Sequence, residues 1–451
     1  MTSLQRPLRG VLAVFVLLSL GQSCKKDSTL SGKAPVITGI SSDRVMPGAM
    51  LTIYGSHFSP TVDSNVVKFD GIRAMVRSIT LNSLVVIVPK GIHAGRRSLS
   101  VTVGGSGGNI PPVLVTEVSA STIAGVPQVP GDVENSINLP ALSEKFNQPY
   151  GLTVDHSGSF IYVADAGNNT IKVINLSNGT AYSLEGECCV ILGTDPGLIY
   201  PTGVLFSRDG NQFFIVDNAQ SCIREQPAAD LLDLFNYAGT AGTPGYFNSG
   251  LAAAKFAFPN GIVEDANGAL YVTDQGNSVI RSISGGTVSL FAGNPTSHGF
   301  ANGTGGAAKF NHPAGIGIDN QGNLYVADFY NNRIRKITPQ GVVSTYAGSG
   351  APGFTDGDAG SATFNGPNGI AVDHSGNVYV ADYNNNAIRV ITIDGFVITL
   401  TGTGTAGFND GMPDVAQFNG PTGIAVDAKG VIYVADRNNH CIRKLVWVTV
   451  Q

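Results

Sequence analysis

Short runs of alternating apolar and polar residues follow one another along the chain from residue 34 onwards. NVYVAD at 377–382 and AIRVI at 387–391 are typical, and turn-forming Gly, Asn and Asp residues separate such runs. Alternation with a period of two predicts β-strands that bury one face. Because these segments lack the apolar spacing of a helix, the pattern predicts an all-β protein.

The alternating pattern itself repeats after residue 118. Strands of the YVAD type end in an aspartate at intervals of 52, 57, 54, 54 and 54 residues, at Asp165, Asp217, Asp274, Asp328, Asp382 and Asp436. A period of this length indicates one repeated supersecondary unit, as in a propeller or a solenoid. A copy contains four predicted strands, of which the third carries Ile-Arg, with Lys172 replacing Arg in the first copy. The fourth strand ends in Tyr-Ala-Gly or a similar triplet.

The order of these strands predicts a closed ring. The triplets occur at Ile123–Gly125, Ile191–Gly193, Tyr237–Gly239, Phe291–Gly293, Tyr346–Gly348 and Leu400–Gly402. The first precedes every complete copy, whereas the last copy ends in CIRKLVWVTVQ without a triplet. We therefore expect the strand around Val118–Gly125 to complete the last blade, which removes the exposed sheet edges that favour aggregation.

The repeated pattern P-x-G-I-x-V-D-x-x-G-x-[VLI]-Y-V-A-D-x-x-N-N-x-I-R resembles the NHL repeat, which builds six-bladed β-propellers. The resemblance covers residues 118–451 and is weakest in the second copy, where NQFFIVDNAQSCIREQ lacks the paired Asn. Residues that recur in nearly every copy are predicted to be structural. The final Asp would accept backbone N–H groups of the following turn, and the Asn pair would adopt left-handed turn geometry. The Arg after Ile would pack its stem between blades and pair locally.

The segment before the repeats also reads as short strands, in PVITGI, AMLTIYG, NVVKFDG, LVVIVP and SLSVTV. Strands of this length and spacing predict a β-sandwich. Their order, with Pro47-Gly48 before LTIYGSHF and Val88-Pro89 after a strand, resembles the IPT/TIG family of immunoglobulin-like domains. The resemblance implies a spacer or interaction module, here a stalk rather than a catalytic unit.

The N-terminus has the features of a targeting segment. Arg6 and Arg9 precede an apolar run, Val11 to Leu20, that is too short for the ~20 residues of a membrane-spanning helix. The following GQSCKKDS resembles a lipoprotein signal of the Bacteroidetes type, in which Cys24 becomes the lipidated first residue. An ordinary secretory peptide cut nearby is the alternative.

Together these features predict a signal peptide at 1–23, a linker at 24–33, an IPT/TIG sandwich at 34–117 and a six-bladed propeller at 118–451. We expect a cell-envelope protein that is lipid-anchored to the outer membrane, either periplasmic or surface-exposed. It would touch the membrane only through its lipid anchor.

Composition narrows the possible functions. Charged residues make up 13% of the chain, against about a quarter in average soluble proteins, and the net charge is −5 without a long basic run. The electrostatic footprint of a nucleic-acid-binding protein is therefore missing.

The remaining cysteines fit neither a CxxC zinc site nor a dense disulfide framework. Cys188 and Cys189 could bridge each other or Cys222, whereas Cys222 and Cys441 are not expected to pair.

Ligand binding is expected where the loops entering the inner strands meet the hairpins after YVAD, because every blade contributes two loops to that face. Between Pro and Gly the copies carry a mostly polar, uncharged ring: Tyr150, Thr202, Asn260, Ala314, Asn368 and Thr422. The hairpins add Phe329, Tyr330, Tyr383, Arg437 and His440. Aromatic rings beside amides and hydroxyls suit a glycan or another neutral polar ligand. The alternative is that Phe329, Tyr330 and Tyr383 only cover neighbouring loops.

Two other functional classes stay open. NHL propellers often serve as protein-interaction platforms, here of an envelope or uptake complex. Related six-bladed propellers include metal-dependent lyases and lactonases, but only His298, His312 and His440 fall near the predicted face, and no third His matches His312 and His440 in the ring. We therefore predict no zinc site and no catalytic residue. A calcium site built from Asn260, Asn368 and a carboxylate is the one cofactor that the sequence leaves open.

Overall fold

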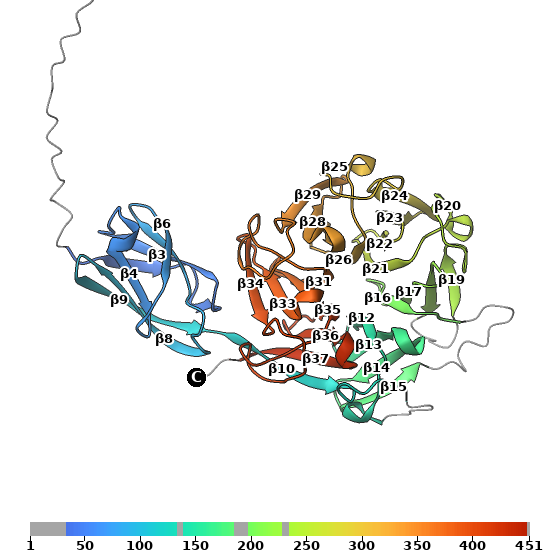
Figure 1. The fold of residues 1–451 in the computed structure, drawn as a ribbon, viewed down its shortest axis with the longest axis horizontal. Coiled ribbons are helices and arrows are strands. Elements are labelled where there is room, and N and C mark those ends of the chain that lie inside the picture. The colour runs from blue at the N-terminus through green and yellow to red at the C-terminus, as the bar shows by residue number, and fades with distance from the viewer. Residues whose placement is uncertain (1–32, 133–138, 185–196, 228–233, 449–451) are drawn as a thin grey trace, which may run out of the picture.

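The computed structural model describes residues 33–132, 139–184, 197–227 and 234–448. It confirms an all-β protein in which an immunoglobulin-like sandwich precedes a ring of sheets around a central axis (Figure 1). The predicted lipidation site Cys24, and also Cys188 and Cys189, lie outside the described residues. Helical structure in the described part is limited to short 3-10 turns: η1 (Val62–Ser64), η2 (Ala141–Ser143), η3 (Ala166–Asn168), η4 (Leu251–Ala253), η5 (Gly305–Ala307), η6 (Phe329–Asn331), η7 (Tyr383–Asn385) and η8 (Arg437–Asn439).

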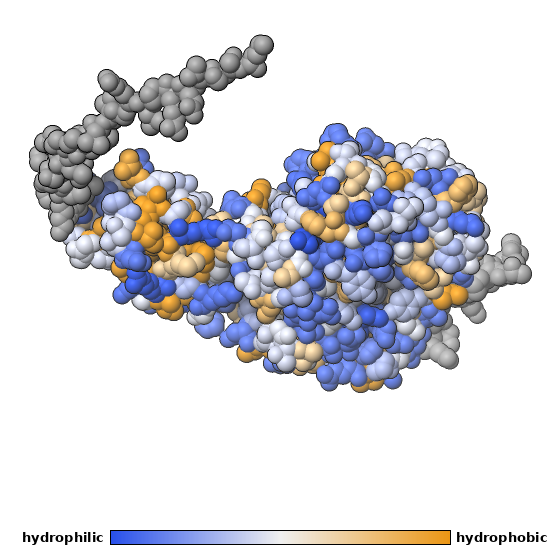
Figure 2. Space-filling view, turned by 45° about the horizontal axis from the view of Figure 1, so that its top comes forward, coloured by the Kyte–Doolittle hydropathy of each residue, from blue (hydrophilic) through white to orange (hydrophobic). Residues whose placement is uncertain are grey.

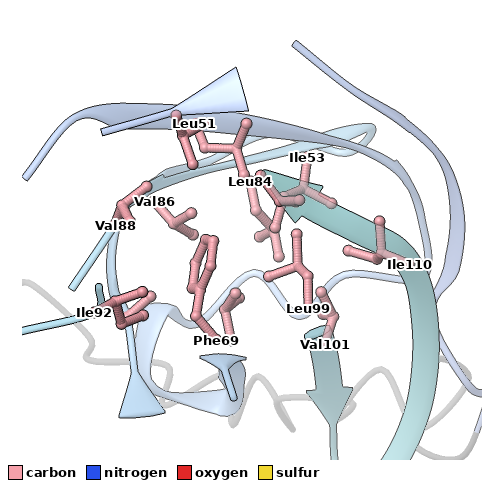
Figure 3. Close-up of a cluster of buried hydrophobic side chains, with 14 of the residues drawn as sticks. Leu51, Ile53, Phe69, Leu84, Val86, Val88, Ile92, Leu99, Val101 and Ile110 are labelled. Atoms are coloured by element: carbon pink, nitrogen blue, oxygen red, sulfur yellow. The ribbon is translucent and has the colours of Figure 1, made fainter. Parts of the chain in front are cut away.

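The sandwich consists of two sheets packed face to face. One sheet has the order β1 (Val36–Ile40), β3 (Met50–Ser56), β7 (Ser83–Ile87), β6 (Met75–Ile79). The other has the order β2 (Arg44–Val45), β9 (Ser106–Val115), β8 (Gly95–Val103), β4 (Asn65–Phe69), β5 (Ile72–Arg73). Alternate side chains point between the sheets, so that Ile53 and Leu84 meet Phe69 and Leu99 in a buried core (Figure 3).

The repeats form six sheets among the described residues, and each sheet is one blade. The innermost strands are β12 (Pro149–Val154), β16 (Pro201–Phe206), β21 (Pro259–Glu264), β26 (Pro313–Ile318), β31 (Pro367–Val372) and β35 (Pro421–Val426). The second strands are β13 (Phe160–Asp165), β17 (Gln212–Asp217), β22 (Leu270–Asp274), β27 (Leu324–Asp328), β32 (Val378–Asp382) and β36 (Ile432–Asp436). The third strands are β14 (Thr170–Asn175), β18 (Cys222–Pro227), β23 (Val279–Ser284), β28 (Arg333–Ile337), β33 (Ala387–Ile391) and β37 (Cys441–Val448).

The outer strands of blades 1 to 5 are β15 (Thr180–Leu184), β19 (Phe235–Ala238), β24 (Thr287–Ala292), β29 (Val342–Ala347) and β34 (Phe396–Thr401). Four blades carry a short fifth strand: β11 (Leu139–Pro140), β20 (Ser249–Gly250), β25 (Gly303–Thr304) and β30 (Gly357–Asp358). Blade 2, where the repeat is weakest, still forms the regular sheet β16-β17-β18-β19. In blade 1 the triplet expected to end the outer strand, Ile191–Gly193, lies outside the described residues.

The ring closes as predicted. The outer strand of blade 6 is β10 (Glu117–Ala124), which comes from the N-terminal side of the propeller and pairs antiparallel with the C-terminal strand β37. The register runs from Glu117 opposite Val448 to Ala124 opposite Ile442. The inner strand β35 of this blade lies beside β12 of blade 1, so that the inner strands form an unbroken circle (Figure 1).

A glycine in each inner strand allows neighbouring blades to approach closely. These glycines are Gly151, Gly203, Gly261, Gly315, Gly369 and Gly423. A Cβ on any of them would lie 3.1 Å or less from a backbone oxygen of the next blade, and Gly423 faces Tyr150 across the closing interface. Only glycine fits such an approach, which explains the P-x-G pattern in every copy.

The sandwich packs directly on blade 5 and is not a separate stalk. Only Thr116 separates β9 of the sandwich from β10 of the propeller. Ala49 of the sandwich belongs to the same buried hydrophobic cluster as Ile398 and Leu400 of β34. At the rim of this interface Lys90 Nζ lies 2.6 Å from Asp356 Oδ2. Two units that share a core and lack a linker are expected to move as one body.

Candidate ligand-binding face

A buried aspartate at the end of the second strand holds each blade together. In blade 6, Asp436 Oδ1 accepts the N–H of Asn419, and Asp436 Oδ2 accepts N–H groups of Asn439 and Arg443 at 2.9 and 2.8 Å. Burial raises the pKa of the Asp436 carboxyl to about 6, against the opposing effect of Arg443. Corresponding bonds form in blades 3 to 5. These carboxylates are engaged inside their blades. The backbone N–H that each accepts in blades 3 to 6 comes from the loop before the inner strand and not, as predicted, from the following turn.

Blade 1 departs from this arrangement because Lys172 replaces the arginine. Lys172 Nζ binds Asp132 and Glu144 at 2.7 and 2.8 Å rather than the blade aspartate. Burial raises the pKa of Asp165 to about 8, because the Lys172 charge only partly offsets it.

Neighbouring blades are joined on the predicted face by a cycle of hydrogen bonds. The residue before each inner-strand proline has a left-handed backbone, with φ between 48° and 59°: Gln148, Tyr200, Phe258, His312, Gly366 and Gly420. Its N–H donates to a side chain at the end of the preceding blade's hairpin: His440, Asn169, Ser221, Ser278, Asn332 and Asn386, in the same order. The 3.1 Å bond from Gln148 N–H to His440 Nδ1 joins blade 6 to blade 1 and completes the cycle.

The size of the residue before proline determines where hairpin aromatics can lie. A Cβ on Gly366 would meet the Phe329 ring at 3.0 Å, and a Cβ on Gly420 would meet the Tyr383 ring at 2.9 Å. Both rings therefore lie over the glycine of the next blade. This agrees with the alternative that these two aromatics cover neighbouring loops.

Tyr330 differs, since it is 59% exposed. Its ring packs edge-on against His312 at 4.7 Å and Phe329 at 5.0 Å, and Phe329 lies 6.2 Å from Tyr383. We call His312, Tyr330, Phe329 and Tyr383 the aromatic arc. It forms a continuous aromatic surface over blades 4 and 5.

The polar ring predicted around the channel is largely bonded to itself. Asn260 and Asn368 each donate an Nδ2 hydrogen to the Tyr150 hydroxyl at 3.0 Å, so that blades 1, 3 and 5 meet at one oxygen. Thr202 and Thr422 donate instead to the carbonyls of Asn260 and Tyr150 in the next blade. Burial raises the pKa of Tyr150, which keeps this hydroxyl neutral.

The cavity at this channel mouth has a volume of about 90 Å³. Small-molecule pockets usually enclose ~300–1,000 Å³, whereas one water needs ~10–15 Å³, so the channel is too small for a sugar and has room for several water molecules. Its described lining contains no carboxylate, which leaves a calcium ion there without a charged ligand. A ligand would therefore lie above the ring, against the hairpins.

Arg437 lies between the channel mouth and the aromatic arc. Its Nη2 donates to Tyr200 Oη at 2.7 Å and to Gln148 Oε1 at 2.9 Å, and its Nη1 donates to Tyr383 Oη at 3.3 Å. The guanidinium also lies 5.6 Å from the centre of the Tyr150 ring, a cation–π contact. One half-buried arginine thus connects blades 1, 2, 5 and 6 on this face.

The structure brings the predicted residues Tyr150, Tyr383, Arg437 and His440 into one connected group. Sequence reasoning missed Gln148 and Tyr200, which complete the surroundings of Arg437. Both stand directly before the inner-strand proline, so an alignment of that position across the copies would have located them. Their left-handed backbone gave no signal, because glutamine and tyrosine rarely adopt it.

The described residues contain no group of three His, Cys, Asp or Glu side chains arranged to hold a metal ion. His312 lies near His298, and burial together with that neighbour lowers the pKa of His312. Cys222 and Cys441 are both buried and do not pair with each other. No described helix has the length and hydrophobicity to span a bilayer.

A larger cavity of about 270 Å³ lies on the opposite side, between the turns of blades 4 and 5. Its lining includes Tyr325, Lys336, Tyr346 and His374, and contains none of the predicted site residues. The two tyrosines pack edge-on at 4.8 Å, and Lys336 Nζ lies 5.3 Å from the Tyr325 ring centre.

The visible propeller surface is mainly hydrophilic with scattered hydrophobic residues, whereas the sandwich shows more hydrophobic colour (Figure 2).

The fold and the face together define a six-bladed propeller fused to an immunoglobulin-like domain, and comparison with known families agrees. Residues 310–337, 364–391 and 418–445 match the NHL repeat, and residues 35–116 match the IPT/TIG domain. The chain therefore carries NHL repeats and an IPT/TIG domain, as the sequence patterns predicted.

Two relatives are similar to part of the chain. Protein SUPPRESSOR OF QUENCHING 1, chloroplastic, from Arabidopsis thaliana is 30% identical over 268 residues, which is 55% of this chain and 25% of that protein. NHL repeat-containing protein 2 from Homo sapiens is 29% identical over 312 residues, which is 58% of this chain and 42% of that protein. This chain thus spans less than half the length of these relatives.

Solved structures match more of the chain. A protein of unknown function from Bacteroides thetaiotaomicron has a TM-score of 0.59 at 20% identity and covers 92% of this chain and 99% of its own. An auxiliary nutrient binding protein from the same species has a TM-score of 0.55 at 18% identity, with coverage of 92% and 98%. Another protein of that description, from Bacteroides ovatus, has a TM-score of 0.55 at 19% identity, with coverage of 93% and 99%. At such identities the likeness shows a shared fold.

Proposed function

We propose that this protein is a non-catalytic binding protein of the cell envelope, anchored through Cys24, and that its aromatic arc and Arg437 bind a glycan. The main support for this proposal is the exposed Tyr330 ring. It contacts Phe329, Phe329 contacts Tyr383, and Tyr383 reaches the hydroxyl and amide groups around Arg437. A sugar stacks its apolar face on such a ring and exchanges hydrogen bonds with neighbouring hydroxyls.

The shape of the face supports an extended ligand. The channel mouth is too small for a sugar ring, whereas the aromatic arc crosses two blades at the surface. An oligosaccharide lying along the arc would keep its reducing and non-reducing ends in solvent. Structures of the same fold described as auxiliary nutrient binding proteins are consistent with such a role.

The test is glycan-array screening of the wild-type protein, followed by calorimetry on the bound glycan with Tyr330→Ala combined with Tyr383→Ala. We expect affinity to fall at least tenfold, since loss of one aromatic contact costs ~0.5–1.5 kcal/mol beyond its buried area. Phe235→Ala is the matched control, because Phe235 is 53% exposed on an outer strand of blade 2.

Unchanged affinity in the double variant would place the glycan elsewhere. If the array gives no signal and a fixed protein co-purifies from native membranes, the face serves a protein-interaction platform of an envelope complex instead.

A further inference from the structure

One positive charge on the binding face has no counter-charge. Among the described residues Arg437 forms no ion pair, since its three hydrogen bonds go to the neutral groups of Gln148, Tyr200 and Tyr383. The third-strand arginines that follow Ile behave differently, because Arg281, Arg335, Arg389 and Arg443 each bind the aspartate of their own blade.

The carboxylate nearest in sequence is already engaged. Asp436 Oδ1 accepts the Asn419 N–H, and its Oδ2 is shared by Asn439 and Arg443. Asp382 of blade 5 is occupied in the same way by Asn365, Asn385 and Arg389. Neither aspartate could therefore rotate toward Arg437 without breaking a buried network.

The donors around Arg437 are incompletely used. A guanidinium carries five N–H groups, of which three are engaged here. Arg437 Nε is buried without an acceptor among the described residues. Nη1 forms one hydrogen bond within the described part of the chain, to Tyr383 Oη. The Tyr383 hydroxyl accepts from Nη1 and gives its own hydrogen to no described group. An oxygen placed beside Nη1 and Tyr383 Oη would accept from both.

We propose that the glycan bound by this face carries an acidic group, a uronic carboxylate or a sulfate ester, which binds Arg437 and the Tyr383 hydroxyl while a sugar ring packs on the aromatic arc. The proposal rests on the proposed function and specifies its ligand class. Charge-assisted bonds to an arginine fork are the strong contacts for carboxylates and sulfate-like anions. A neutral sugar would leave the half-buried charge unpaired, which disfavours binding.

The experiment compares three oligosaccharide sets of equal length on the full-length protein by calorimetry: uronic-acid oligosaccharides, their methyl esters and sulfated oligosaccharides. The variants are Arg437→Gln and Arg437→Lys, and the control is Arg333→Gln. Arg333 is the matched control because it also lacks a carboxylate partner among the described residues and packs over Phe300 at 4.0 Å.

We expect an acidic set to bind wild type at least tenfold more tightly than the methyl esters, and Arg437→Gln to remove that preference. Arg437→Lys should retain part of it, because the charge remains without the planar fork, and Arg333→Gln should stay within twofold of wild type. Whichever acidic set shows the preference identifies the carboxylate or the sulfate. The preference should also weaken with added salt.

Three results would overturn the inference. If methyl esters and acids bind equally, and binding still depends on Tyr330, the ligand is neutral and the proposed function stands. If Arg437→Gln lowers the melting temperature but keeps the preference for acids, Arg437 only closes the ring. If no oligosaccharide binds wild type, the proposed function fails and the inference fails with it.

Discussion

The inner-strand glycines set the distance between blades at the level of single atoms. Gly369 faces the backbone oxygen of Thr422, and no side chain separates the two strands. A polar residue before such a glycine can then reach the next blade, as Thr422 does when it donates to the Tyr150 carbonyl at 2.9 Å. The channel mouth is narrow because the blades meet backbone to backbone.

Gly369→Ala is therefore expected to destabilise the propeller strongly. Its Cβ would overlap the Thr422 backbone oxygen, which cannot move without shifting β35. We expect a loss of at least ~2 kcal/mol, in the upper part of the range for overpacked cores. Thermal unfolding of this variant should be compared with Gly360→Ala, an exposed site where a Cβ meets nothing within 4 Å. Equal melting temperatures would contradict the explanation of the glycine ring.

Residues that recur in every copy were predictable, and residues that act through contacts between copies were not. The engaged aspartates and the left-handed Asn332 and Asn386 follow from the repeat pattern. The hydrogen bond from Arg437 to Tyr200 could not be predicted from the repeat pattern, because it joins blade 6 to blade 2 across the closed ring. Only the closed geometry brings those two positions together.

At the scale of elements, each blade is joined to the next by a hairpin side chain that accepts an inner-loop N–H. The accepting side chain is Asn in blades 1, 4 and 5, Ser in blades 2 and 3, and His440 in blade 6. Asn and Ser accept at any ordinary pH. His440 accepts through Nδ1 only while that nitrogen is unprotonated, so the closing junction is the titratable one in this cycle.

This junction should make stability depend on pH. Burial and the nearby charge of Arg437 lower the pKa of His440 below its ordinary value of ~6.5. A lowered folded-state pKa means that the stabilisation is complete above pH ~6.5 and is lost as the pH falls through the folded-state pKa. The melting temperature of wild type should therefore fall more steeply between pH 7.5 and pH 5 than that of His440→Asn, which carries the blade 5 residue type.

The control for that measurement is His156→Asn, because His156 is exposed in a turn at the opposite end of blade 1. Its pH profile should follow wild type. Parallel profiles for wild type and His440→Asn would mean that the ring closure does not titrate.

Ring closure itself was predictable from the order of strands. A triplet stood before the first copy and none followed the last, and β10 indeed pairs with β37. The ends of strands that border long loops were harder to predict from the sequence. In blade 1 the described outer strand is Thr180–Leu184, and the triplet expected to end it lies outside the described residues. Propensity locates regular strands, whereas loop lengths between them vary freely.

At the scale of the whole molecule, the sandwich and blade 5 form one packed unit. Outer strands expose alternate residues, and at one such position blades 3 and 4 carry the exposed Ser289 and Ser344. Blade 5 carries Ile398 there, 1% exposed in the hydrophobic cluster that contains Ala49 of the sandwich. This exchange of serine for isoleucine is the sequence signal of the docking surface. From the sequence alone this signal is ambiguous, because an apolar residue in an outer strand can equally belong to the blade's own core.

Ile398→Asp should separate the two units. A carboxylate at this position would be buried against Ala49 and the apolar side chains of β34, and desolvating an unpaired charge costs several kcal/mol. In differential scanning calorimetry we expect wild type to unfold in one transition and Ile398→Asp to show two, since the sandwich has a complete core of its own. Ser344→Asp adds the same charge at the exposed equivalent of blade 4 and should keep the single transition. If both variants unfold like wild type, this hydrophobic cluster does not hold the sandwich on blade 5, and the orientation of the sandwich relative to the propeller is then not fixed by Ile398.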